Sequence, residues 1–379
     1  MKRSTTRILT THTGSLPRPL ALLELLNAKE AGTLSDHNAL HASVKSAVAE
    51  VVKQQVDAAV DIVSDGELGK IGYSTYVKDR LTGFDGEGSV SVRADWADFP
   101  DALARQVRSP GVARPSCNGP IAWKDKSAVQ VDIDILQAAI TRTAPQEAFM
   151  TAASPGVIAH FLQNQYYATR DEYLATLANV MKEEFEAITQ AGFLLQLDCP
   201  DLAMGRHLRF PDLSTDEFLE IAETNVEALN HSIQNIPAEQ VRLHLCWGNY
   251  EGPHHRDIPL RDILPTVLKA NVGAISFEGA NPRHEHEWNV FKDIKLPDHM
   301  IIIPGVIDST TNYIEHPEVV AQRIIRYSEV VGRDRVIAGS DCGFGTFAST
   351  TYIVEPEIVW AKFQSLTKGA RIASEQLWP

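Results

Sequence analysis

Two patterns of apolar residues alternate along the chain. Short runs rich in β-branched residues predict strands, and longer stretches with apolar residues every three or four positions predict helices. The predicted strands are Ile8–His12, Asp61–Ser64, Ala148–Ala153, Leu194–Asp198, Val241–Cys246, Ala274–Glu278, Met300–Ile307 and Arg335–Ser340. The predicted helices, most of which follow a capping residue or a proline, are Ser35–Ala59, Arg170–Gly192, Ser214–Ile233, Pro317–Val331 and Pro356–Ser374.

This alternation predicts the fold. Parallel strand pairs need crossover connections, and helices must cover the outside of the sheet. We therefore expect an α/β fold, a (β/α)8 TIM barrel, with residues 1–379 as a single catalytic domain. Residues 73–143 interrupt the rhythm, because they are rich in Gly, Asp, Pro and Ser and include the alternating segment Ser89–Arg93. We interpret them as an inserted hairpin or lid between the second and third strands, with a solvated loop as the alternative.

Polar residues gather at the carboxyl ends of the predicted strands. In a barrel this is the rim where catalytic groups lie, so an enzyme is favoured over a binding or scaffold protein. The segments concerned are His12-Thr13-Gly14-Ser15, Asp65-Gly66-Glu67, Gln196-Leu197-Asp198-Cys199-Pro200, His244-Leu245-Cys246, Glu278, Asp308 and Asp341-Cys342-Gly343.

Composition narrows the class of protein. The 379 residues include 35 Lys+Arg against 49 Asp+Glu, a net charge of −14, and no basic run that would bind nucleic acid or an anionic membrane surface. The basic start of the chain lacks the apolar core of an export signal, and no apolar run is long enough to span a bilayer, so we expect a cytoplasmic protein. Four cysteines are too few for a disulfide framework and are expected to be thiols or metal ligands.

The segment His244-Leu245-Cys246 has the spacing of a metal site. Residues two apart on a strand point to one face, so the imidazole and the thiol can share an ion. Cys342 and Glu278, at two other strand ends, would complete a mixed set of sulfur, nitrogen and oxygen ligands that suits Zn²⁺. The alternative is a buried His-Cys pair without a metal.

Seven segments, in the same order, resemble the catalytic barrel of cobalamin-independent methionine synthases and of related single-barrel proteins, including the epoxyalkane:coenzyme M transferases. The segments are His12–Arg18, Asp65–Glu67, Leu195–Pro200, His244–Cys246, Ile275–Glu278, Pro304–Asp308 and Asp341–Gly343. They are similar to the family's I-G-S-F-P, H-G-E, I-Q-I-D-E-P, H-M-C, I-T-I-E, G-P-G-V-Y-D and P-D-C-G, respectively.

The resemblance implies a chemistry and assigns residues to it. It implies that His244, Cys246, Glu278 and Cys342 bind zinc, and that the metal activates a small thiol as a zinc thiolate. It also implies that three residues line the thiol pocket: Ser15, Glu67 and Asp198. The expected partners are a small thiol and an alkyl or methyl donor, and the expected activity is S-alkyl or S-methyl transfer.

The chain departs from the family at the predicted acid. The segment after the seventh predicted strand reads Asp308-Ser309-Thr310-Thr311, where the family has D-I-H-S, so the histidine thought to protonate the leaving group is Thr310 here. Cys199 also replaces the acidic residue of I-D-E-P, and the N-terminal barrel of the methionine synthases is missing. Methylfolate and homocysteine are therefore not assigned. The candidate catalytic residues are Asp308, His254, His255, His284 and His286, with solvated surface histidines as the alternative.

Some assignments stay open. Arg18 either binds an anionic group of the substrate or pairs with a neighbouring acid. Rival functions are a zinc hydrolase or lyase acting on a thioether or ester, and a zinc- or thiol-binding protein without catalysis. The sequence leaves open which thiol and donor are used and whether the chain forms a homo-oligomer.

Overall fold

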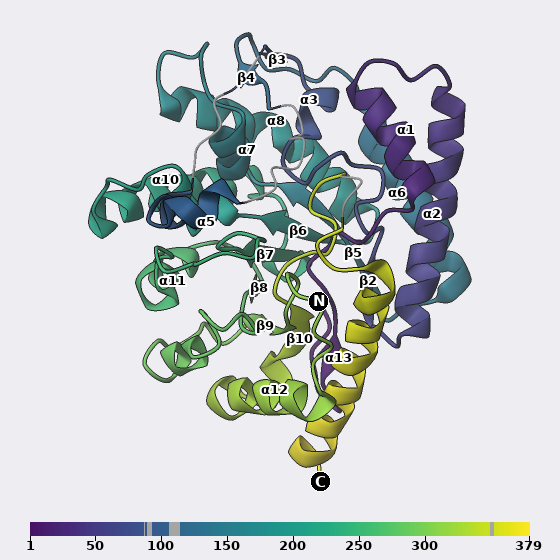
Figure 1. The fold of residues 1–379 in the computed structure, drawn as a ribbon, viewed down its shortest axis with the longest axis vertical. Helices are drawn as coiled ribbons and strands as arrows, with labels where there is room; N and C mark the ends of the chain where they lie inside the picture. The colour runs from purple at the N-terminus through teal and green to yellow at the C-terminus, as the bar shows by residue number, and fades with distance from the viewer. Residues whose placement is uncertain (87, 89–92, 106–113, 349–351) are drawn as a thin grey trace.

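The computed structural model describes residues 1–379 except 87, 89–92, 106–113 and 349–351. Eight parallel strands form one sheet in the order β1, β10, β9, β8, β7, β6, β5, β2, surrounded by helices (Figure 1). The strands are β1 (Leu9–Thr10), β2 (Ile62–Ser64), β5 (Glu147–Ala153), β6 (Leu194–Asp198), β7 (Val241–Leu245), β8 (Ala274–Phe277), β9 (Ile301–Ile307) and β10 (Ile337–Ser340). The predicted (β/α)8 barrel is confirmed.

The barrel closes between β1 and β2, the two ends of the strand order. The backbone N–H of Asp61 donates to Thr10 O at 3.2 Å, and the Thr11 hydroxyl donates to Ile62 O at 3.0 Å. All eight predicted strands are present within a few residues. The largest difference is at the first, because β1 has only two residues and His12 lies beyond it.

The side chains that point into the barrel change from apolar at the amino ends of the strands to polar at the carboxyl ends. On β6, alternate side chains share one face, so Leu194, Gln196 and Asp198 follow one another from the amino to the carboxyl end. Leu194 belongs to an apolar cluster built from seven of the eight strands: Leu9, Ile62, Phe149, Leu194, Ala274, Ile301, Ile303 and Ile337. The amino-terminal half of the barrel is therefore filled by hydrophobic side chains, and polar groups occupy the carboxyl half.

The predicted helices cover the outside. They correspond to α2 (His37–Asp57), α8 (Arg170–Gln190), α10 (Thr215–Ser232), α12 (Pro317–Val331) and α13 (Pro356–Leu377). Ser214 and Glu217 form a capping box at the start of α10, whereas α2 is capped by Asp36, one residue later than predicted. Other helices are α1 (Leu20–Glu30), α7 (Pro155–Phe161), α9 (Gly205–Leu208), α11 (Leu260–Val267) and the 3-10 helices η1 (Pro200–Leu202), η2 (Ala238–Gln240), η3 (Glu287–Lys292) and η4 (Arg333–Arg335).

The segment predicted as an insertion has two parts. Its last portion is α6 (Ser127–Thr143), which packs against α2 and α8 and so belongs to the helical layer. The rest holds α3 (Val77–Arg80), α4 (Ala94–Ala97), α5 (Pro100–Ala104) and an antiparallel pair, β3 (Phe84–Asp85) with β4 (Ser116–Cys117). Most of the predicted segment Ser89–Arg93 lies outside the described residues. No helix in the described part of the chain is long and apolar enough to cross a membrane.

Candidate active site

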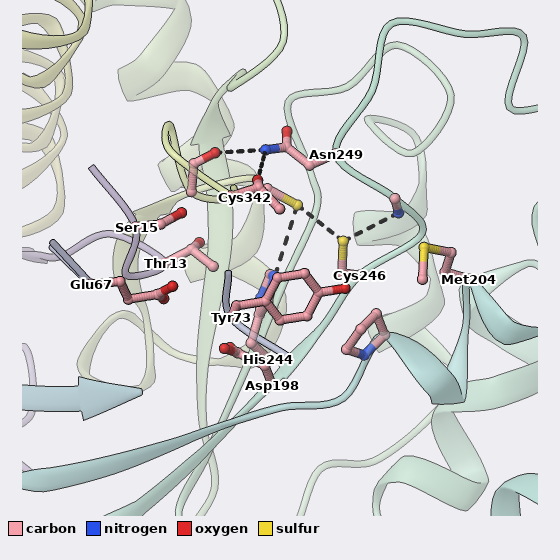
Figure 2. A pocket seen from close by; sticks show the side chains of 14 residues that line it. Thr13, Ser15, Glu67, Tyr73, Asp198, Met204, His244, Cys246, Asn249 and Cys342 are labelled. Carbon is pink, nitrogen blue, oxygen red and sulfur yellow. Dashed lines mark hydrogen bonds between the residues drawn. The ribbon is translucent and has the colours of Figure 1, made fainter. Parts of the chain in front are cut away.

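A pocket opens at the carboxyl ends of the strands, where the polar residues were predicted to meet (Figure 2). Its walls come from the loops after β1, β2, β6, β7 and β10. The lining residues are Thr13, Ser15, Glu67, Tyr73, Asp198, Pro200, Met204, His244, Cys246, Gly248, Asn249, Cys342, Gly343 and Thr346.

Two thiols and one imidazole meet in this pocket. Cys246 Sγ lies 3.1 Å from Cys342 Sγ, and Cys342 Sγ lies 3.8 Å from His244 Nε2. One ligand atom from each of the three residues falls within 4.8 Å of the others. His244 and Cys246 point to the same side of their strand, as their spacing predicted, and Cys342 comes to them from the turn after β10 (Figure 2).

Glu278, directly after β8, lies beside this cluster. Its Oε1 is 3.7 Å from Cys342 Sγ and accepts the backbone N–H of Trp247 at 2.8 Å. Its Oε2 accepts from the Asn281 side chain at 3.2 Å. The carboxylate is therefore held at the edge of the three-residue cluster rather than inside it.

The electrostatics of the cluster suit a cation. Burial lowers the pKa of His244 to about 3, so the imidazole is neutral, the form that binds metals. Contact with Cys246 and burial raise the pKa of Cys342 well above its ordinary value. Two adjacent buried thiols cannot both ionise unless a positive charge joins them.

The spacing of the donors fits zinc as well. Zn–S bonds of about 2.3 Å and Zn–N bonds of about 2.0 Å place neighbouring tetrahedral ligand atoms roughly 3.5–3.8 Å apart. The contacts of Cys342 Sγ with His244 and Glu278, at 3.8 and 3.7 Å, match that spacing, and the two sulfurs at 3.1 Å lie somewhat closer.

Two carboxyl groups line the side of the pocket away from the sulfurs. Burial raises the pKa of Glu67, and burial together with Glu67 raises the pKa of Asp198 well above its ordinary value. Glu67 adopts a left-handed backbone conformation with φ of 57°, uncommon for a residue with a side chain. Its Oε2 is buried and accepts no hydrogen bond from the described residues. One carboxylate oxygen on this side of the pocket is therefore free to accept a hydrogen bond from a ligand.

Asp198 is oriented by a chain of hydrogen bonds inside the barrel. Gln196 Nε2 donates to Asp198 Oδ1 at 2.8 Å, and Arg242 Nε donates to Gln196 Oε1 at 2.8 Å. Arg242 is fully buried, stacks on Phe149, and also donates to Thr11 Oγ1 and to the carbonyl of His12. Burial lowers the pKa of Arg242 to about 9.

Comparison with known proteins decides the family. The family model for the catalytic domain of cobalamin-independent synthase matches residues 8–355. The chain belongs to the cobalamin-independent methionine synthase family. Methionine synthase of Thermococcus kodakarensis is 25% identical over 365 residues, covering 96% of this chain and 93% of the relative. That of Sulfolobus acidocaldarius is 26% identical over 369 residues, covering 97% and 93%.

Solved structures share the fold of this family member. The B12-independent methionine synthase of Shewanella sp. W3-18-1, in complex with selenomethionine, superposes with a TM-score of 0.75 at 20% identity, covering 98% of this chain and 99% of that one. A putative B12-independent methionine synthase of Listeria monocytogenes superposes with a TM-score of 0.66 at 18% identity, covering 97% and 98%.

Two histidines predicted as acids belong to a separate cluster in this family member. His254 Nδ1 and His284 Nε2 lie 2.8 and 3.0 Å from Asp257 Oδ2, and His207 Nδ1 lies 3.1 Å from Asp257 Oδ1. His284 also contacts Glu287 at 2.8 Å and stacks on Trp247. Neither His254 nor His284 lines the pocket, because the loops after β7 and β8 turn both rings toward Asp257.

The other candidate acids also lie outside the pocket. His255 is paired with Asp98 at 2.8 Å, and His286 is exposed. The Asp308 carboxylate caps its own turn by accepting from Thr310 and Thr311. Both Asp308 carboxylate oxygens therefore accept hydrogen bonds from residues of their own turn. Thr310, which stands where the family has a histidine, lies in that turn.

Arg18 does not line the pocket. Its guanidinium is buried and donates to the carbonyls of Gly345 at 2.5 Å, and of Glu67 and Lys70 at 2.8 Å each. Neither predicted role describes this arrangement, because the partners are backbone oxygens rather than a substrate anion or an acid. Arg18 instead joins the loops after β2 and β10.

Several pocket residues were not singled out from the sequence: Tyr73, Met204, Asn249 and Thr346. Asn249 Nδ2 bridges the Gly343 carbonyl at 2.7 Å and Thr346 Oγ1 at 2.8 Å, which ties the β7 loop to the β10 loop. The sequence signal that could have indicated Asn249 as a pocket residue is its position three residues after Cys246, a predicted metal ligand. Tyr73 gave no comparable signal, because it opens the segment interpreted as an insertion.

Proposed function

We propose that this chain is a zinc-dependent methyl- or alkyltransferase acting on the sulfur of a small thiol, with His244, Cys246, Cys342 and Glu278 holding the metal. The observation that carries the proposal is the convergence of two thiols and a neutral imidazole in one pocket, with the Glu278 carboxylate beside them. Membership of the cobalamin-independent methionine synthase family supports the reaction class, since the curated relatives are methionine synthases.

Zinc, when bound there, would deprotonate an incoming thiol and orient its sulfur for attack on an electrophilic carbon. The protein residues supply the surroundings. Trp247 N–H and Asn281 fix the Glu278 carboxylate, and three backbone N–H groups, of Gly279, Ala280 and Asn281, donate to Asp341 at 2.7–2.8 Å. The β8 and β10 loops that carry Glu278 and Cys342 are thereby held together.

Glu67 and Asp198 would bind the polar end of the thiol. Glu67 Oε2 is buried and has no donor in the part of the chain that the structure describes, and a buried acceptor without a partner is costly. A substrate amino group would satisfy that oxygen and stabilise the ionised form of the carboxyl pair. Ser15 lies on the same side, with its hydroxyl oxygen accepting from the Gly345 backbone at 3.4 Å.

The part of the predicted insertion around α4 is proposed to act as a lid. Asp95 of α4 accepts hydrogen bonds from the Tyr250 hydroxyl and from the His254 backbone, at 3.1 Å for the latter. The lid is therefore docked on the loop that follows Cys246. Retained substrate affinity in a folded variant lacking this segment would argue against the role.

Zinc binding and product formation test the proposal together. The purified protein should contain about one zinc per chain, and Cys246→Ser and Cys342→Ser should each lose most of it. Cys117→Ser is the matched control, because Cys117 is equally buried but lies in β4. Zinc-loaded protein supplied with a thiol and a panel of methyl donors should yield a thioether by mass spectrometry. Thioether yield that is the same in Cys342→Ser as in wild type would refute the metal's role.

A further inference from the structure

Two arginines near the pocket have no acidic partner among the described residues. The Arg114 guanidinium carbon lies 5.0 Å from the Phe161 ring centre and 5.8 Å from that of Phe347. The Arg93 guanidinium carbon lies 3.9 Å from the centre of the Tyr250 ring. Both side chains are half-buried, and Arg93 Nε is buried without a hydrogen-bond partner in the described part of the chain.

The aromatic rings connect Arg114 to the pocket. Tyr73, which lines the pocket, lies 5.9 Å from both Phe161 and Phe347, the two rings that Arg114 covers. Phe347 directly follows the pocket residue Thr346, and its backbone bridges to Gly72. Arg114 therefore lies beside the pocket wall that Tyr73 forms, and none of the described carboxylates pairs with it.

Arg93, directly before α4, lies over Tyr250 of the β7 loop, and that loop forms part of the pocket wall. The Tyr250 ring beneath it packs close to Gly248, a lining residue. Burial and the nearby charge of Arg93 lower the pKa of Arg114. Among the described residues, no acidic side chain compensates these two partly buried like charges, although the net charge of the chain is −14.

Other arginines of the chain form ion pairs that compensate their positive charge. Arg80, which is buried, pairs with Glu184 at 2.7 Å and also with Asp132. Arg256, on the same loop as Tyr250, pairs with Asp98 at 2.6 Å. A guanidinium that lacks such a partner and lies beside a pocket is suited to a carboxylate or sulfonate of a ligand, which it can bind through two parallel hydrogen bonds.

We propose that Arg114, assisted by Arg93, binds an anionic group, a carboxylate or sulfonate, carried by a substrate of this pocket. This inference rests on the proposed function, because it says that one substrate of the proposed transfer reaction carries a negative charge. The anionic group belongs either to the thiol substrate or to the second substrate, which exchanges the methyl or alkyl group with the thiol. In both cases the substrate extends from the sulfur cluster past Tyr73 to the guanidinium groups.

Calorimetry with the zinc-loaded protein tests the assignment and separates the two sources. If the thiol carries the charge, 3-mercaptopropionate binds at least about 10-fold more tightly than neutral 2-mercaptoethanol, a difference of about 1.4 kcal/mol. If the other substrate carries it, propionate binds more tightly than propionamide to protein saturated with 2-mercaptoethanol. In either case Arg114→Gln removes the preference for the anion and changes 2-mercaptoethanol affinity less than twofold.

Three further variants sharpen the result. Arg114→Lys should retain part of the preference, Arg93→Gln should reduce it less than Arg114→Gln, and Arg256→Gln should leave it intact as the paired control. Equal binding of charged and neutral probes by the wild type would overturn the proposal, as would an Arg114→Gln variant indistinguishable from Arg256→Gln. Failure of every thiol to bind, with propionate still bound in an Arg114-dependent way, would refute thiol transfer while supporting the anion site.

Discussion

The sulfur atoms of Cys246 and Cys342 lie 3.1 Å apart, although 96 positions separate the two residues in the chain. β7 and β10 are not neighbours in the barrel, so the contact depends on the loops at their carboxyl ends. Cys342 is followed by Gly343, where a Cβ atom would overlap Ser15 Oγ. The turn that carries Cys342 therefore packs directly on the turn that carries Ser15.

Gly343→Ala is expected to disturb the metal centre more than the fold. Overpacking of this kind costs roughly 1–3 kcal/mol, and the strain falls on Ser15 and Cys342. Zinc affinity, measured by competition with a chromophoric chelator, should drop clearly. Gly119→Ala is the control, since the nearest atom to its Cβ lies at an ordinary 3.5 Å. Zinc affinity that stays equal in the two variants would show that the turn adapts.

Arg242→Met should destabilise the barrel. The substitution leaves Gln196 Oε1, Thr11 Oγ1 and the His12 carbonyl without the Arg242 donor in the buried interior of the barrel. Unsatisfied buried acceptors cost roughly 1–3 kcal/mol each, so a loss of about 3 kcal/mol or more is expected in urea unfolding. Arg261→Met, at an exposed pair with Asp293, should change stability by less than about 0.5 kcal/mol. A loss no larger than that of the control would contradict the role of Arg242.

The histidine cluster around Asp257 should make stability fall at alkaline pH. Burial lowers the pKa of His284, but hydrogen bonds to Asp257 and Glu287 outweigh it and raise the pKa to about 10. The unfolded chain releases this proton near about 6.5. The stabilisation is therefore complete below that pH and is lost as pH rises to about 10, by at most roughly 1.4 kcal/mol per pH unit.

Urea unfolding of wild type and His284→Gln between these pH values measures the contribution. The wild type should lose stability with rising pH more steeply than the variant. His286→Gln is the control, because His286 is exposed. Parallel pH profiles for wild type and His284→Gln would show that His284 is not held as the imidazolium cation in the folded protein.

Asp95→Ala should loosen the proposed lid. Asp95 is fully buried, and its carboxylate accepts from the Tyr250 hydroxyl and the His254 backbone. Without it, hydrogen exchange in α4 should accelerate, and thiol affinity should fall because the β7 loop loses its cover. Asp101→Ala, an exposed acid on α5, should change neither. Unchanged exchange in Asp95→Ala would mean that other contacts dock the segment.

The sequence predicted the parts of the site that depend on strands. Alternation along β7 placed His244 and Cys246 on one face, and parallel strands brought their carboxyl ends to one rim. Parts that depend on loop conformation could not be predicted. His254 has a left-handed backbone with φ of 53°, which follows from the path of its loop, and its ring meets Asp257, not the pocket. Arg18 likewise donates to backbone carbonyls of the loops after β2 and β10, and the sequence around Arg18 does not predict the conformation of those loops.

X-ray absorption at the zinc edge of the purified protein tests the central claim most directly. The proposed centre predicts two sulfur ligands at about 2.3 Å together with nitrogen and oxygen ligands at about 2.0–2.2 Å. The zinc that Cys342→Ser still holds when the metal is supplied in excess should show one sulfur ligand, whereas Cys117→Ser should leave the spectrum unchanged. A shell of nitrogen and oxygen alone, or a spectrum that Cys342→Ser does not alter, would contradict the assignment of the two cysteines as ligands.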